Sequence, residues 1–301
     1  MRHLTVRQLE VLEALADYHY LMPAQMVRLG LSTSVWAMRS ILNRFDFEIR
    51  GENGGKMRSN KAEIGAIKAG VDRDSGRIAR MYYLTRSGAE VVAERRQVNP
   101  ESIFYPKGDK LALADIPHRR LAIDFRIELD FFVNKAGFAV EFYHHYFRSS
   151  GANRGANPDE RLRKLTRIDF PEEVVKRCKK PFFWPDGIFA LRSKEKRVLY
   201  LVEACRGIDT GRVMRQLDWH VVALEHGLPS LKYGFDTANK VLLVFEGESA
   251  LAAVLRQLLL RTDLDAFRGL IACSTIERLK GNFQEWYYVR QGNITAGGLL
   301  S

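Results

Sequence analysis

The sequence predicts an α/β protein with two domains. Patterns for three short helices and two strands occupy the N-terminal third, and a longer run of alternating helix and strand patterns follows. The length of 301 residues and the hydrophobic content of 46% suffice for two apolar cores. The third observation is that two acidic residues stand at neighbouring ends of a predicted β-hairpin in the second domain.

The composition favours an acidic partner. The chain has 47 Lys and Arg residues against 36 Asp and Glu residues, a formal net charge of +11. Nucleic acid is the commonest acidic partner of a basic protein, and a basic surface that only promotes solubility is the alternative. The cysteines are scattered and form no CxxC pair, which predicts neither a disulfide framework nor a zinc site: Cys178, Cys205 and Cys273.

We expect a cytoplasmic protein without a membrane span. The first residues lack the apolar stretch of a signal peptide, and charges such as Arg256 interrupt the longest apolar runs.

The first predicted helix covers residues 6–17. Thr5 and Gln8 have the spacing of a capping box, and leucines then recur at helical spacing. Pro23 can open a second, short helix that ends at Gly30.

Ser32 or Thr33 can cap a third helix, whose apolar side would pack inward. Helix, short helix, turn and third helix is the order of a helix-turn-helix, in which the third helix enters the DNA major groove. Its predicted outward side chains are Ser34, Arg39 and Asn43.

Strand patterns at residues 45–49 and 81–84 enclose a glycine-rich, basic segment. This is the pattern of a winged helix, with the basic segment as a wing along DNA phosphates. A winged helix that binds only protein is the alternative. The candidate wing cations are Arg50, Lys56, Arg58, Lys61, Lys68, Arg73, Arg77 and Arg80.

Residues 97–112 lack periodicity and contain prolines and a glycine, so we place a domain boundary after residue 104. The elements predicted beyond it are a helix from residue 117, strands at 138–147, 182–191 and 197–205, a helix at 210–226, a strand at 240–245, a helix at 249–260 and a strand at 269–274. Residues 149–180 are predicted as a long insertion or flexible loop.

The order α-β-β-β-α-β is that of the PD-(D/E)xK, restriction-endonuclease-like core, here with extra C-terminal elements. Such cores use two carboxylates to hold Mg²⁺ or Mn²⁺ and a lysine to orient water. Asp186 starts one predicted strand and Glu203 lies near the end of the next, so both can reach one ion. Without an ion, their repulsion would raise the pKa of one of them.

Cys205 stands where the lysine of such a site is expected, and a neutral thiol cannot replace that cation. Candidate replacements are Lys194, Lys196, Arg206 and Arg215. In the alternative interpretation Asp186 only makes the turn of Pro185-Asp186-Gly187, and Glu203 pairs with Arg206 or Arg215.

Other DNA chemistry fits less well. Relaxases with a His-hydrophobic-His motif need two imidazoles on one strand face, whereas the adjacent His144 and His145 would point to opposite faces. His118 could bind phosphate or metal, or only pack. Paired aromatic residues on strands are typical of a core rather than of covalent nucleophiles: Tyr82, Tyr83, Tyr143, Tyr287 and Tyr288.

Several short motifs between residues 4 and 226 resemble the replication-relaxation family, which is linked to plasmid replication and mobilisation and overlaps the MobC-type relaxases. They are Leu4-Thr5-x-Arg7-Gln8, Tyr83-Leu84-Thr85-x-x-Gly88, His118, Pro185-Asp186-Gly187 and Glu203-x-x-Arg206-Gly207. The resemblance implies a winged helix fused to a nuclease-type fold, with Asp186, Glu203 and His118 as the first positions to test. The family pattern has an acidic residue where Cys205 lies.

The leading hypothesis is a DNA-binding protein of a plasmid or other mobile element, which binds double-stranded DNA in replication or mobilisation. The alternatives are an active Mg²⁺-dependent nickase or relaxase that uses Asp186 and Glu203, and a transcriptional autorepressor with an inactive nuclease fold. Further expected partners are a second copy of the chain and the mobilisation or replication machinery.

Overall fold

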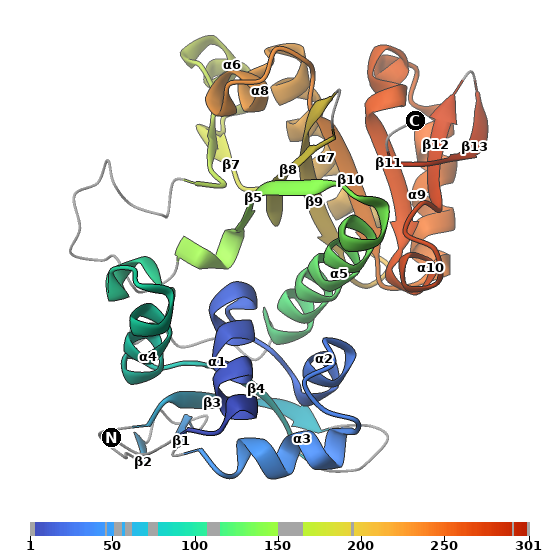
Figure 1. Cartoon of the computed structure of the whole chain (residues 1–301). Helices are drawn as coiled ribbons and strands as arrows, with labels where there is room; N and C mark the ends of the chain where they lie inside the picture. The colour runs from blue at the N-terminus through green and yellow to red at the C-terminus, as the bar shows by residue number, and fades with distance from the viewer. Residues whose placement is uncertain are drawn as a thin grey trace. The chain divides into compact units, whose positions relative to one another are not determined.

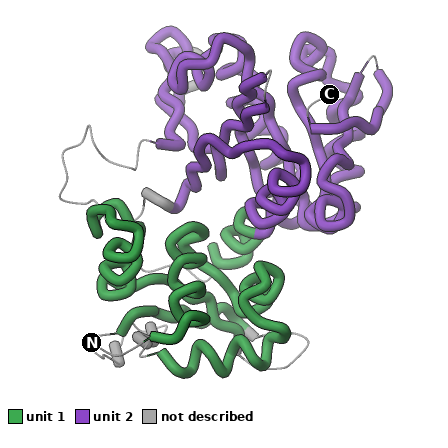
Figure 2. Tube along the Cα trace, viewed as in Figure 1, with its two compact units in different colours: residues 1–123, 150–155 green, residues 124–149, 156–301 purple. Residues whose placement is uncertain are grey.

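The protein is a mixed α/β protein (Figure 1). The computed structural model describes residues 4–45, 47–50, 56–57, 62–71, 78–106, 115–149, 165–193, 196–290 and 292–299. The chain divides into unit 1, residues 1–123 and 150–155, and unit 2, residues 124–149 and 156–301 (Figure 2). This division falls inside helix α5 (Asp115–Ala136), and the sequence-based boundary after residue 104 stays a prediction.

Unit 1 begins with the predicted capping box. The Thr5 hydroxyl accepts from the Gln8 amide, and the Gln8 side chain accepts from the Thr5 amide at 3.0 Å. Ser34, rather than Ser32 or Thr33, caps the third helix, because its hydroxyl accepts the Ala37 amide at 3.1 Å. The helices are α1 (Val6–Tyr18), α2 (Pro23–Arg28), α3 (Val35–Leu42), α4 (Arg86–Arg96) and the 3-10 turn η1 (Pro100–Ser102).

A four-stranded sheet of order β2-β1-β3-β4 follows α3. Its strands are β1 (Phe47–Arg50), β2 (Lys56–Met57), β3 (Ile64–Val71) and β4 (Ile78–Leu84). β3 and β4 form an antiparallel hairpin, and Leu21, between α1 and α2, bridges to Tyr82 of β4.

The sequence predictions missed β3, in which Gly65 interrupts the apolar alternation. A Cβ at Gly65 would overlap the Tyr83 ring, so the glycine allows that ring to lie across the hairpin.

Unit 2 is built on a seven-stranded sheet of order β13-β12-β11-β10-β9-β8-β5. The central strands β9, β10 and β11 are parallel, and the other neighbours are antiparallel. The strands are β5 (Ala139–His145), β8 (Gly187–Arg192), β9 (Arg197–Cys205), β10 (Lys240–Phe245), β11 (Ile271–Thr275), β12 (Trp286–Arg290) and β13 (Asn293–Gly297).

Helices cover both faces of this sheet. On one face the α5 residue Phe125 packs its ring 6.0 Å from Phe189 and 6.4 Å from Trp286. On the other face α7 (Thr210–Glu225) and α9 (Glu248–Leu260) share an apolar cluster with β9, β10 and β11. The remaining helical segments are η2 (Tyr146–Ser149), α6 (Glu172–Cys178), α8 (Leu228–Tyr233), η4 (Thr262–Leu270) and α10 (Ile276–Gly281).

The predicted element order recurs as α5, β5, β8, β9, α7 and β10, with α8 as an unpredicted addition. The strand predicted at residues 182–191 is confirmed from residue 187 onward as β8, but it is not continuous, because the chain leaves the strand around Pro185, which has no amide to donate. Its first part, β7 (Phe182–Phe183), instead pairs with β6 (Ile168–Asp169) outside the main sheet.

The predicted loop at residues 149–180 is wrong in its second half, because that half contains β6 and α6. Residues 150–164 lie outside the described part of the chain. None of the helices described in the structure is long and apolar enough to cross a membrane.

The aromatic stack at the centre of unit 2 predicts a large stability effect. Phe189 is fully buried, and its ring lies 4.9 Å from Tyr200 and 5.6 Å from Tyr143. We expect Phe189→Ala to lower the free energy of unfolding by about 3–5 kcal/mol, since it leaves a cavity in a packed core. Urea unfolding measures this, with the half-exposed Phe131→Ala as the control, for which a loss below about 1 kcal/mol is expected. Equal losses in both variants would contradict the proposed core.

Candidate functional site

The hairpin of β8 and β9 brings Asp186 and Glu203 together at one end of the sheet. Gly187 pairs with Val202 across the hairpin, and the Ala204 amide donates to Asp186 Oδ2 at 2.8 Å. Asp186 is also a hydrogen-bond partner of Glu203, and both side chains are buried. The predicted convergence of the two carboxyl groups, here named the carboxyl pair, therefore occurs, while the roles of these residues as catalytic groups and metal ligands stay predictions.

Two side chains of α7 hold the Glu203 carboxyl from the other side. His220 Nε2 lies 2.6 Å from Glu203 Oε1, and Gln216 Nε2 donates to Oε2 at 3.1 Å. Gln216 and His220 are four residues apart, so they share one face of the helix. Neither residue was predicted, although their position as polar residues beside the inward Leu217 and Val221 was an available signal.

Burial governs the charges in this cluster. Burial raises the pKa of Glu203 well above its usual range, and repulsion from Asp186 raises it further. Burial lowers the pKa of His220 to about 3, so the imidazole is neutral at neutral pH. Its Nδ1 is buried without a hydrogen-bond partner among the described residues. In a neutral ring that donates from Nε2, Nδ1 carries no proton and can only accept.

Cys205 packs into the apolar cluster beneath α7 and α9 and is 2% exposed. Burial raises the pKa of its thiol well above the usual range, and the charge of Glu203 adds to this. The side chain is therefore a neutral core group and supplies no positive charge.

The cations that act on Glu203 are Lys180, which precedes β7, and Arg212, in the first turn of α7. Burial lowers the pKa of Lys180, whereas the charge of Glu203 raises it. The sequence analysis missed both residues, because neither lies near Glu203 in the chain.

The roles of the predicted replacement cations stay predictions, and the structure gives the positions of three of them. Lys196 precedes β9, at the strand end remote from Glu203, and Arg206 pairs with Glu246 at 3.5 Å. Arg215 is exposed on α7, while Gln216 and His220 are the residues there that bind Glu203. Pairing of Glu203 with Arg206 or Arg215 is therefore wrong. Lys194 lies outside the described residues.

The remaining candidates fall elsewhere. His118 lies in the first turn of α5, within unit 1, and is half-buried, whereas the carboxyl pair belongs to unit 2. Adjacent residues His144 and His145 contact different rings, Phe142 and Phe147, as expected for opposite strand faces. Three of the five tyrosines, Tyr82, Tyr83 and Tyr288, are buried, and Tyr143 and Tyr287 are half-buried, which agrees with a core role.

Tyr143 of β5 packs beside the carboxyl pair. A Cβ at Gly187 would lie 2.7 Å from the Tyr143 hydroxyl, so glycine is needed after Asp186 for this close approach. Arg126 of α5 lies 4.5 Å over the Tyr143 ring. Burial raises the pKa of Tyr143, so its hydroxyl is protonated at neutral pH.

In unit 1, α3 presents a mixed polar and aromatic surface. Ser34 and Asn43 are exposed at its two ends, and Arg39 is half-buried between them. Trp36, which the sequence analysis did not select, is 77% exposed.

The predicted wing cations are described only in part. Arg80 and Lys68 are half-buried on β4 and β3, and Arg80 lies beside Tyr82. Arg50 and Lys56 belong to β1 and β2, but their side chains fall outside what the structure describes. Arg58, Lys61, Arg73 and Arg77 lie outside the described residues altogether.

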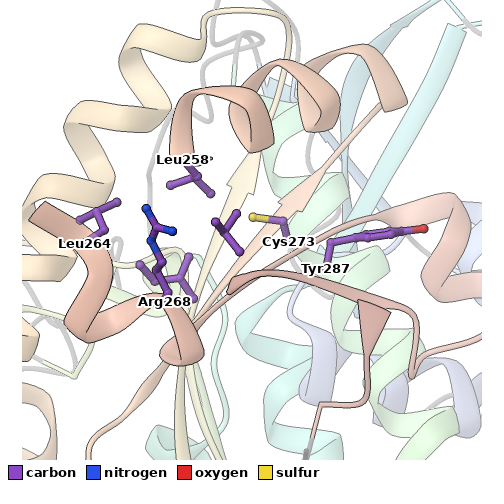
Figure 3. A pocket seen from close by; sticks show the side chains of 7 residues that line it. Leu258, Leu264, Arg268, Cys273 and Tyr287 are labelled. Carbon is purple, nitrogen blue, oxygen red and sulfur yellow. The ribbon is translucent and has the colours of Figure 1, made fainter. Parts of the chain in front are cut away.

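A small cavity between α9, η4, β11 and β12 lies in the apolar part of unit 2 (Figure 3). Its volume is about 10 Å³, which suits one water molecule rather than a substrate. Its lining is mostly apolar, with one arginine: Leu258, Leu264, Arg268, Ile271, Cys273, Tyr287 and Val289.

Comparisons of the chain with protein-family models, with curated proteins and with solved structures found no match.

The buried carboxyl pair predicts a stability that falls as pH rises. Because the folded-state pKa of Glu203 is raised, this group adds to the free energy of unfolding in full below pH 4.5. That stabilisation is lost as pH rises through the folded-state pKa. We expect Glu203→Gln to be more stable than the wild type at neutral pH and to lose this part of the pH dependence. Thermal unfolding from pH 4.5 to pH 8 measures both effects. A wild type whose stability rises over this range relative to Glu203→Gln would contradict the prediction.

Proposed function

We propose that the chain is a cytoplasmic DNA-binding protein of the replication-relaxation type, which acts on a plasmid or other mobile element. In this proposal unit 1 is a winged helix that binds duplex DNA, and unit 2 is a PD-(D/E)xK-like fold. The observation that carries the proposal is the order of elements in unit 1. Helices α1, α2 and α3 precede the β3–β4 hairpin, and the Leu21 bridge joins the α1–α2 connection to that hairpin.

The surface of α3 supports duplex recognition. Met38 and Leu42 anchor the helix in the core, which leaves Ser34, Trp36 and Asn43 exposed. Hydroxyl and amide side chains can bond to base edges, and an aromatic ring can contact a thymine methyl group. Arg44 follows the helix and is exposed, which suits a phosphate contact.

The net charge of +11 supports the same partner, because counterion release from DNA accompanies each phosphate contact. Arg50 and Lys56, on the β1–β2 pair, remain proposed wing contacts to phosphates.

Duplex binding should be sensitive to salt and to α3. We expect log Kobs for duplex DNA from the chain's own upstream region to fall linearly with log salt, and Arg44→Ala to make the slope shallower by about 1. Trp36→Ala should weaken binding without lowering stability, since the ring is exposed. Fluorescence anisotropy measures these effects, with the exposed unit 2 variant Arg256→Ala as the charge-matched control. Binding that is independent of salt, or equal in Arg44→Ala and Arg256→Ala, would argue against this role.

The carboxyl pair favours metal-dependent DNA nicking as a second candidate function. Mg²⁺ or Mn²⁺ prefers oxygen ligands, and two adjacent buried carboxyls repel each other unless a cation or a proton lies between them. Asp186 and Glu203 therefore fit such an ion. Among the described residues, no group of three or more His, Cys, Asp or Glu side chains is placed to hold a metal ion. Asp186 and Glu203 would hold the ion, Gln216 and His220 would orient Glu203, and Lys180 would supply the positive charge that Cys205 lacks.

Nicking should depend on the carboxyl pair. If unit 2 is active, wild type with Mn²⁺ should convert supercoiled plasmid carrying the cognate origin to the open-circular form, and Asp186→Asn should lose at least about a hundredfold in rate. Agarose gel electrophoresis of the plasmid measures the conversion, and Arg215→Ala, which lies on α7 outside the cluster, is the control. Equal conversion by wild type and Asp186→Asn would exclude this activity, and duplex binding without nicking would favour the autorepressor alternative.

A further inference from the structure

We propose that unit 2 carries a second nucleic-acid site, which binds a single strand by stacking an unpaired base on Trp184. The site is the aromatic–cation strip, defined as Arg167, Lys180, Phe182, Trp184 and Trp219. It goes beyond duplex recognition by α3, and it rests on the proposed function only for the choice of DNA as the nucleic acid.

Alternation along one extended segment builds the strip. In an extended chain every second side chain points to the same side, which groups Lys180, Phe182 and Trp184. Phe183 points the other way, into the apolar cluster, where its ring lies 4.9 Å from His220. Packing of Phe183 therefore turns its two aromatic neighbours outward.

Trp184 is the exposed platform of the strip. Its side chain is 45% exposed, and its ring centroid lies 4.7 Å from that of Phe182, which supports it from behind. An exposed ring by itself is common at a protein surface, whereas here the exposed ring adjoins a second aromatic ring that carries a cation. Stacking on such a ring is sequence-tolerant, since every base has a π face.

Two rings of the strip each carry a cation. Arg167 holds its guanidinium 4.0 Å over Phe182, and Lys180 places its ammonium over the Trp219 ring of α7. Lys232 of α8 adds a third charge, because its Nζ donates to the backbone of residue 167. Asp169 pairs with Arg167 and offsets part of this charge. The three positive charges of Arg167, Lys180 and Lys232 still exceed the one negative charge of Asp169.

Interleaved rings and cations fit a single strand better than the alternatives. A duplex hides the faces of its bases, whereas an unpaired strand exposes base faces and phosphates together. An apolar protein partner would gain nothing from the arginine and lysines.

The location of the strip ties it to the carboxyl pair. Trp184 stands two residues before Asp186, and Lys180 acts on Glu203. β6 pairs with β7 and also contacts α8, so the strip rests on folded elements. A strand stacked on Trp184 would lie beside Asp186 and Glu203.

Binding of fluorescein-labelled oligo(dT) and oligo(U) to the full chain, followed by anisotropy, tests the proposal. Trp184→Ala should weaken oligo(dT) binding about tenfold or more, because stacking on one aromatic ring is worth that much. Trp184→Phe should bind within about threefold of the wild type while quenching of tryptophan fluorescence by oligo(dT) decreases. The control is Leu260→Ala, which removes an 82% exposed side chain from α9 and should bind as the wild type does.

Equal oligo(dT) binding by Trp184→Ala and Leu260→Ala would overturn the proposal, as would Trp184→Phe binding as poorly as Trp184→Ala. Much tighter binding of oligo(U) that still depends on Trp184 would support the strip and replace DNA by RNA. Duplex affinity, measured on the same samples, separates the two proposals. If the wild type does not bind duplex DNA but binds oligo(dT) in a way that depends on Trp184, only the proposed function is contradicted.

Discussion

Burial of the Glu203 carboxyl beside Asp186 is the constraint on which the rest of unit 2 depends. An acidic side chain that is 2% exposed is stable only if it is protonated, hydrogen-bonded or neutralised by a cation. His220, Gln216 and the Asp186 carboxyl supply the hydrogen bonds, and Lys180 supplies positive charge. The position and the rotation of α7 about its own axis relative to the end of β9 are therefore fixed, because Gln216 and His220 must both reach the Glu203 carboxyl.

Contacts around the same pair also fix the course of the backbone near Trp184. β7 ends at Phe183, two residues before Pro185, Asp186 accepts the Ala204 amide, and Gly187 lies against the Tyr143 side chain. The residues before Asp186 are thereby held in an extended form, with Phe183 inward and Trp184 outward. Under the two proposals above, unit 1 binds duplex DNA and unit 2 binds a single strand, so the protein would act where the two strands separate.

Local signals predicted some elements well. The capping box of Thr5 and Gln8 starts α1, Pro23 starts α2, and the turn after residue 192 joins β8 to β9, because each depends on bonds between residues close in the chain. Strand β3 escaped prediction because Gly65 breaks its pattern and its stabilising contact, the Tyr83 ring, comes from another strand. The insertion with β6 and α6 resembled a loop in sequence because β6 is stabilised by pairing with β7.

By itself the sequence determined the α/β class, the order of the main elements and the meeting of Asp186 with Glu203. Antiparallel register brings the ends of one hairpin together wherever the strands pack. Only the tertiary structure decided which groups surround that pair. Gln216 and His220 come from α7 and Lys180 from the segment before β7, and they reach Glu203 because α7 packs on the sheet and β7 contacts that helix. Their charges, too, are set by burial, a property of the folded core that no pattern of neighbouring residues encodes.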